Sequence, residues 1–137
     1  MRKAVISGLA LVLLFPVAGC GDNPNKVASD RIDLVNRLAE ILEGVKDRQS
    51  AEAARSEVEA VQQQLEVLDE RAKRLKLNEL PRDREGSLKS KFKADMKRAA
   101  ERLKKAQDRV LGNQETAGVL KPLNRDRLAA QIRYFTG

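Results

Sequence analysis

Apolar residues recur along most of this chain at spacings of three and four residues, a pattern that predicts helices with one buried face. The longest regular stretch predicts a helix over 50–77. Its apolar face is an unbroken seven-residue repeat of small and aliphatic side chains, namely Ala51, Ala54, Val58, Val61, Leu65, Leu68, Ala72 and Leu75. Such a repeat is typical of a helix that winds around a partner helix in a left-handed supercoil. We therefore expect a coiled-coil-like pairing here.

A shorter helix is predicted ahead of this stretch, over 29–46, with Ser29 as its N-cap. Its apolar positions include Ile32, Val35, Leu38, Leu42 and Val45. The preceding residues, 20–28, begin with Gly, Asp, Asn and Pro after the cysteine, so we expect them to form a polar tether.

A third helix is predicted over 83–111, because Pro81 separates it from the second and Gly112 is a favourable stop. Its apolar face contains Leu88, Phe92, Met96, Ala99, Leu103, Ala106 and Val110. The second and third helices match in length, at about 42 to 44 Å each for a rise of 1.5 Å per residue. We expect them to form a long antiparallel hairpin with the shorter first helix packed against it.

The remaining residues predict a loop over 114–121 and a short last helix over 122–135. Helix-forming residues dominate the chain, and aromatic residues make up only 3% of it. The sequence therefore predicts an all-α fold in a single domain over 29–137. We expect a small helical bundle built on the antiparallel hairpin, with a shorter helix before it and a short helix after it.

The composition also excludes several kinds of catalytic and metal site. The chain has no histidine and one cysteine, so Ser-His and Cys-His nucleophilic sites and zinc sites of the His and Cys kind are excluded. No Gly-rich phosphate loop is present. Carboxylate pairs on highly charged helices are typical of solvated faces. We expect no catalytic residue, no metal and no cofactor, and thus a protein that is not an enzyme.

The first residues of the chain form a leader. Arg2 and Lys3 provide a positive head, and 4–17 is an apolar run interrupted by Ser7, Gly8 and Pro16. This layout is typical of a secretory signal peptide. The run is about fourteen residues long, short of the roughly 20 that cross a membrane as a helix. Residues 1–19 are therefore expected to be removed.

The leader ends in Val17-Ala18-Gly19-Cys20, which resembles the lipobox of bacterial lipoproteins, with Val17 where Leu is commonest. The resemblance implies cleavage between Gly19 and Cys20 and long acyl chains, such as palmitate, on Cys20. Two or three acyl chains anchor a protein stably, whereas one binds only marginally. The alternative is an ordinary signal peptide with an incidental cysteine.

The lipoprotein resemblance also implies a location, a body held on the extracytoplasmic side of the cell envelope. Gly21 rather than Asp follows the cysteine, which favours the outer membrane over the inner one. The chain departs from the small lipoprotein that is tied to peptidoglycan through a C-terminal lysine, because it ends in Tyr134-Phe135-Thr136-Gly137. That route of attachment to the wall is not supported.

Charge divides the chain into an acidic and a basic part. Residues 22–70 contain six basic and twelve acidic side chains, whereas 71–137 contain nineteen basic and eight acidic ones. One explanation is internal, with acidic helices lying beside the basic third helix. The other is a surface for an anionic ligand on the third helix. Its candidate residues are Lys97, Arg98, Lys104, Lys105 and Arg109.

Two hypotheses for function follow. In the first, the chain is a structural or interaction module, attached to the membrane through lipid on Cys20, that docks on a protein partner or self-associates through its apolar stripe. In the second, it binds an anionic envelope ligand such as a lipid head group, lipopolysaccharide or peptidoglycan. Nucleic acid is disfavoured as a partner, because the protein is expected to be exported and few aromatic residues are available for stacking.

Overall fold

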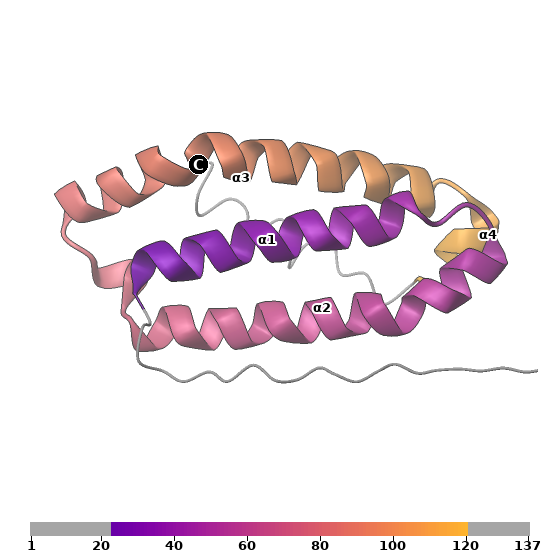
Figure 1. Ribbon diagram of the computed structural model, residues 1–137, viewed down its shortest axis with the longest axis horizontal. Coiled ribbons are helices and arrows are strands. Elements are labelled where there is room, and N and C mark those ends of the chain that lie inside the picture. The colour runs from indigo at the N-terminus through magenta and orange to yellow at the C-terminus, as the bar shows by residue number, and fades with distance from the viewer. Residues whose placement is uncertain (1–22, 121–137) are drawn as a thin grey trace, which may run out of the picture.

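A computed structural model describes residues 23–120, and it confirms the predicted all-α fold (Figure 1). Within this part of the chain there is no strand. The helices are α1 (Pro24–Glu43), α2 (Arg48–Arg74), the 3-10 turn η2 (Leu77–Glu79), α3 (Arg82–Leu111) and the short α4 (Gln114–Ala117). The predicted last helix, 122–135, and the leader lie outside the described residues.

The centre of the bundle is α1, which lies between α2 and α3 (Figure 1). We expected a seam between the second and third helices, but the closest backbone approaches join α1 to each of them. The reason is the width of the buried face of α1. It includes adjacent pairs of positions as well as single ones, and its buried residues are Val27, Ala28, Arg31, Ile32, Val35, Leu38, Ala39 and Leu42. A face of this width packs against two neighbours.

The first helix begins five residues earlier than predicted, at Pro24 rather than at Ser29. The side chain of Asn23 accepts a hydrogen bond from the backbone N–H of Lys26 at 2.9 Å, and proline is favoured at the first helical position. Ser29 is therefore an exposed residue inside the helix. Much of the segment that we expected to be a tether is the first turn of α1.

The second helix is capped by Asp47 rather than by Ser50. The Asp47 carboxylate accepts a hydrogen bond from the backbone N–H of Ser50 at 2.8 Å, and the Ser50 hydroxyl accepts one from the backbone N–H of Asp47 at 3.0 Å. This reciprocal capping box satisfies two of the free N–H groups at the start of α2. It also lowers the pKa of the Asp47 carboxyl, mainly through the backbone hydrogen bond from Ser50.

The connection from α2 to α3 is a tight turn. Lys76 takes a left-handed backbone conformation with φ of 52°, and Leu77 is buried beneath it. Pro81 then precedes α3 without a side-chain cap. At the other end, α3 stops at Gly112 as predicted. The predicted loop after it contains α4, because the Asn113 side chain caps this short helix.

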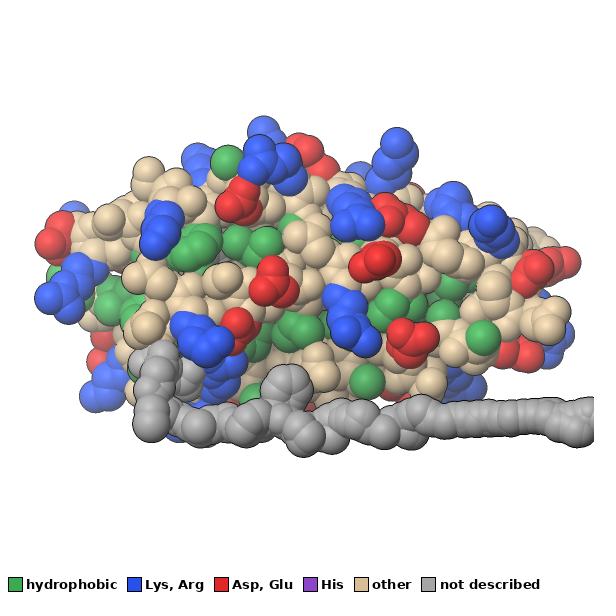
Figure 2. Space-filling view, in the orientation of Figure 1, with side chains coloured by type: hydrophobic (Ala, Val, Ile, Leu, Met, Phe, Trp, Pro, Cys, Tyr) green, Lys and Arg blue, Asp and Glu red, His purple; other side chains and the backbone are tan. Residues whose placement is uncertain are grey.

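The predicted apolar faces form one core. Its largest fully buried side chains include Leu38, Leu42, Leu65, Leu68, Met96 and Leu103. Among the described residues, Val67 is the one large apolar side chain that is exposed. On the face drawn in Figure 2, basic and acidic side chains are interspersed along the helices. No helix in residues 23–120 is long and apolar enough to span a membrane.

Candidate functional site

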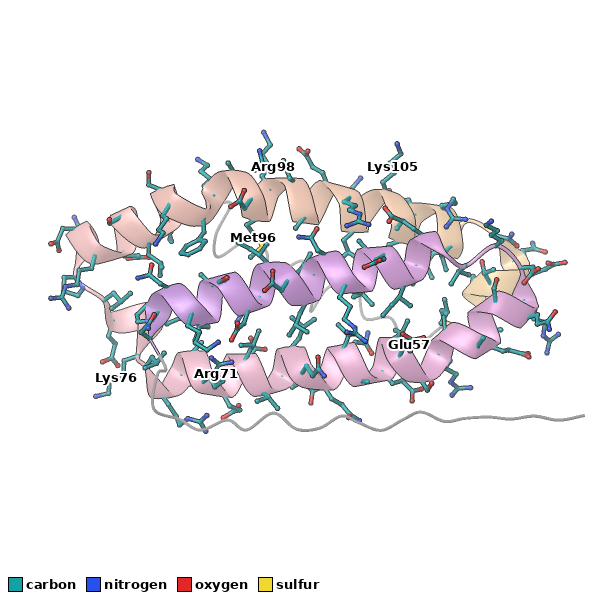
Figure 3. All side chains as sticks on the ribbon, viewed as in Figure 1. Glu57, Arg71, Lys76, Met96, Arg98 and Lys105 are labelled. Carbon is teal, nitrogen blue, oxygen red and sulfur yellow. The ribbon has the colours of Figure 1, made fainter. Side chains whose placement is uncertain are left out.

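Helix α3 carries the basic residues that the sequence points to. It contains eleven basic and five acidic residues and turns its apolar face toward the core. Arg98 and Lys105 project away from the bundle in Figure 3. Lys97 and Lys104 are also exposed. All five candidate residues, Arg109 included, are exposed.

Nearby carboxylates reduce the positive charge of this surface. Arg98 forms an ion pair with Asp95, and Lys104 pairs with Asp108 at 3.4 Å. Lys97 and Lys105 are exposed and have no ion pair or hydrogen bond with another residue of the described part. The candidate surface thus offers two unpaired ammonium groups rather than five cations.

Arg109 is exposed as well, but its guanidinium is bound within the protein. Its guanidinium donates to three backbone carbonyls at the end of α1, those of Val45 at 2.7 Å, Leu42 at 2.8 Å and Glu43 at 3.1 Å. The last carbonyls of a helix have no partner within it, and the negative end of the helix dipole favours a cation. The several N–H donors of arginine can satisfy them together. Arg109 therefore caps α1 from α3.

Arg102 joins the same two helices. Its Nε and Nη2 atoms donate to the Glu43 carboxylate at 2.9 and 2.5 Å. The hydrogen bond from Arg102 is the main reason that the pKa of Glu43 is lowered, although burial opposes it. The same bond raises the pKa of Arg102. Sequence reasoning missed this residue, yet Arg102 and Arg109 are seven positions apart, a spacing that places two side chains on one side of a helix.

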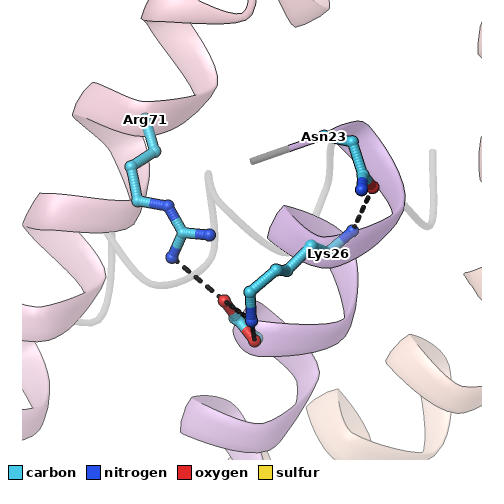
Figure 4. Close-up of polar contacts among 4 residues, drawn as sticks. Asn23, Lys26 and Arg71 are labelled. Carbon is cyan, nitrogen blue, oxygen red and sulfur yellow. Dashed lines mark hydrogen bonds and ion pairs between the residues drawn. The ribbon is translucent and has the colours of Figure 1, made fainter. Parts of the chain in front are cut away.

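Two ion pairs connect α1 to α2. The buried Arg31 donates to Asp69 at 3.0 Å, and Arg71 donates to Asp30 at 3.0 Å (Figure 4). Lys26 also approaches Asp30, at 3.3 Å. Each helix thus provides the basic residue of one pair and the acidic residue of the other. Of these contacts, the pair between Glu43 and Arg102 is the one that joins an acidic helix to the basic third helix, as the internal explanation of the charge pattern requires.

A polar depression lies between the start of α2 and α4. Its lining mixes acidic, basic and amide side chains, including Asp47, Arg48, Glu52, Arg55 and Glu115. Within 23–120, no group of three or more His, Cys, Asp or Glu residues could hold a metal ion.

The predicted lipidation site lies outside the described residues. Cys20 and the cleavage position after Gly19 precede the first described residue, Asn23, by only a few positions. Comparisons of the chain with models of known protein families, with curated proteins and with solved structures find no match.

Proposed function

We propose that this chain is a lipid-anchored lipoprotein whose helical body works outside the cytoplasm as a non-enzymatic structural or protein-interaction module. The observation that carries the proposal is the leader ending in Val17-Ala18-Gly19-Cys20. The start of α1 limits the reach of such an anchor. From Cys20 to the N-cap Asn23 there are three residue steps, which span at most about 10 to 11 Å at 3.3 to 3.6 Å per residue. The anchor would hold the body close to the membrane surface.

The body supports an interaction role through its surface rather than through its apolar stripes. The stripe on α2 is buried inside the chain, so self-association through it would require the bundle to open. The outer faces of α2 and α3 are charged and available. A partner would therefore contact the body mainly through polar and charged groups.

Replacement of Cys20 with Ala tests the anchor. We expect Cys20→Ala to release the protein from the membrane or to leave it unprocessed, because the sulfur that carries the lipid is removed. Val17→Leu, which restores the commonest lipobox residue, is the matched control and should be processed normally. Membrane fractionation and the intact mass measure both. A Cys20→Ala protein that is still cleaved and membrane-bound would contradict the proposal.

In-cell photo-crosslinking tests the interaction role. We expect a probe at Lys97, on the exposed face of α3, to give a discrete heavier band in a gel, with the partner identified by mass. A band at twice the protein mass would indicate self-association. A probe at Glu57, exposed on α2, is the control, because it measures the labelling that results from chance encounters on another face of the bundle. Equal labelling from both positions would contradict a specific partner on α3.

The second hypothesis is an anionic envelope ligand, and the unpaired Lys97 and Lys105 favour it. In that case the same probe at Lys97 would label lipid or glycan rather than protein. In isolated membranes, the yield of such adducts should fall when salt is raised from about 50 to 200 mM before illumination, because exposed charges are screened over a Debye length of about 8 Å at physiological ionic strength. A protein adduct, rather than a lipid or glycan adduct, would support the interaction role instead.

A further inference from the structure

A second group of exposed cations lies at the turn between α2 and α3, away from the surface that the sequence singled out. It consists of Arg74, Lys76, Arg82 and Arg84, which we call the turn cluster. All four side chains are exposed, and no residue of the described part pairs with any of them. They are therefore available to an anionic partner.

The turn cluster lies at the end of the bundle where α1 begins. The contact between Arg71 and Asp30, at 3.0 Å, places the last turns of α2 beside the first turns of α1. Figure 1 shows the start of α1 and the turn between α2 and α3 at the same end. Lys76 projects away from the bundle there (Figure 3). Because Cys20 lies within about 10 to 11 Å of Asn23, its lipid would leave the protein at this end.

The shape of the turn directs its cations outward. The side chain of Leu77 is buried, 4% exposed, and the left-handed backbone of Lys76 reverses the chain above it. The same segment contains two acidic residues, Glu79 and Asp83, so the four cations keep a positive surplus.

The opposite end of the bundle has no such surplus of positive charge. Across 44–52 and 112–120 it has two basic and three acidic residues, namely Lys46, Arg48, Asp47, Glu52 and Glu115.

We propose that the turn cluster binds the anionic phospholipid head groups of the membrane that holds the Cys20 lipid, so that the bundle stands upright on the surface. This inference rests on the proposed function, because lipid on Cys20 places the membrane at this end. Lys and Arg next to an anionic membrane are attracted to it, and the attraction falls off within a Debye length. The short link from Cys20 keeps this end of the bundle close to the membrane surface.

The candidate surface on α3 predicts a different geometry. Lys93, Lys97 and Lys105 lie along the side of the bundle rather than at its end. Binding of a membrane through them would lay the bundle flat. Since α3 is 30 residues long, about 45 Å at 1.5 Å per residue, the two orientations place its far end at very different heights. Orientation therefore distinguishes the two surfaces.

The test measures the height of two fluorescent probes in the lipidated full-length protein. Ser87→Cys, near the start of α3, and Gln114→Cys, beyond its end, are both exposed and both leave the charge unchanged. Each provides the one reactive thiol, since Cys20 is the only natural cysteine and its sulfur would carry the lipid. The protein is reconstituted in vesicles of phosphatidylcholine, alone or with phosphatidylglycerol, that contain a quencher on the lipid head group. We expect strong quenching at Ser87→Cys in phosphatidylglycerol vesicles and little at Gln114→Cys.

Two sets of charge changes then identify the surface. Lys76→Gln/Arg82→Gln/Arg84→Gln should lower the ratio of docked to undocked protein, read from the quenching at Ser87→Cys, by about fivefold per cation removed and thus by about a hundredfold in total. Lys93→Gln/Lys97→Gln/Lys105→Gln removes the same charge from the side of α3 and should leave the ratio within about twofold. Quenching of both probes together, or loss of quenching in the second set instead of the first, would overturn the inference.

Vesicle flotation and intact mass separate this inference from the proposed function. A protein without lipid on Cys20 contradicts both, because the reason for a membrane at this end is removed. A lipidated protein whose Ser87→Cys probe is quenched equally with and without phosphatidylglycerol contradicts the inference alone. Attachment would then come from the lipid, with no contribution from the turn cluster.

Discussion

Replacing Leu38 with Ala is expected to lower the free energy of unfolding by about 3 to 5 kcal/mol, the upper part of the range for buried leucines. Leu38 is 0% exposed and lies in α1, the helix that packs against both α2 and α3. The cavity would therefore lie at the centre of the bundle, where the surrounding helices are held on two sides and can collapse into it only partly. Urea denaturation of the chain without residues 1–19 measures the change.

Two matched substitutions make this prediction specific. Val67→Ala removes apolar atoms from a side chain that is 58% exposed, so we expect a change within about 0.5 kcal/mol. Leu38→Met nearly conserves the volume and should cost less than about 1.5 kcal/mol. If Leu38→Ala cost no more than Val67→Ala, α1 would not be the centre of the bundle.

Replacing Arg109 with Met is expected to lower the free energy of unfolding by about 2 to 3 kcal/mol. The guanidinium donates to the carbonyls of Leu42, Glu43 and Val45, and hydrogen bonds to charged groups contribute about 1.5 to 3 kcal/mol each. The loss of stability should stay well below the sum for three such bonds, because part of this helix end is exposed and water can replace the donor. Methionine keeps an unbranched apolar stem, so the change reports mainly on the lost donors.

The controls for Arg109 are a lysine at the same position and a methionine at an exposed arginine. Arg109→Lys keeps the charge but has fewer donors in a fixed geometry, so we expect an intermediate loss. Arg98→Met removes a surface ion pair with Asp95 and should change stability by less than about 1 kcal/mol. Hydrogen exchange at the last turn of α1 should rise only in the Arg109 variants. Equal effects of Arg109→Met and Arg98→Met would show that water satisfies these carbonyls as well as arginine does.

Arg98 and Arg109 illustrate how far the spacing of residues along a helix can predict the partners of a side chain. Both residues are basic, both lie off the apolar face of α3, and the sequence offers no difference between them. Arg98 lies on the exposed side and pairs with Asp95 one turn away, whereas Arg109 is opposite the end of another helix. Both are exposed, and only the position of α1 decides which guanidinium is bound to another helix.

The ends of the helices also show that a local sequence pattern can leave two alternatives open. Gly112 could be predicted as a stop because a glycine after a run of helix formers is a local signal. Asn23 with Pro24 and Asp47 with Ser50 are local signals too, but Ser29 and Ser50 offered equally plausible caps. The choice between neighbouring caps shifts a helix start by a few residues. Here it converts most of an expected tether into the first turn of α1, and thereby brings the bundle closer to Cys20.

The helices of this protein follow from signals that are local in the sequence. Apolar spacing defines the three long helices, helix formers and the scarcity of aromatic residues define an all-α fold, and the leader with Cys20 predicts a lipid anchor. The packing of the helices places α1 at the centre, brings Arg102 and Arg109 into contact with it, and puts the cations of the turn at the end where α1 begins. The physical reason is that a helix stripe specifies which face is buried but not which neighbour buries it. That choice depends on how all the faces pack together.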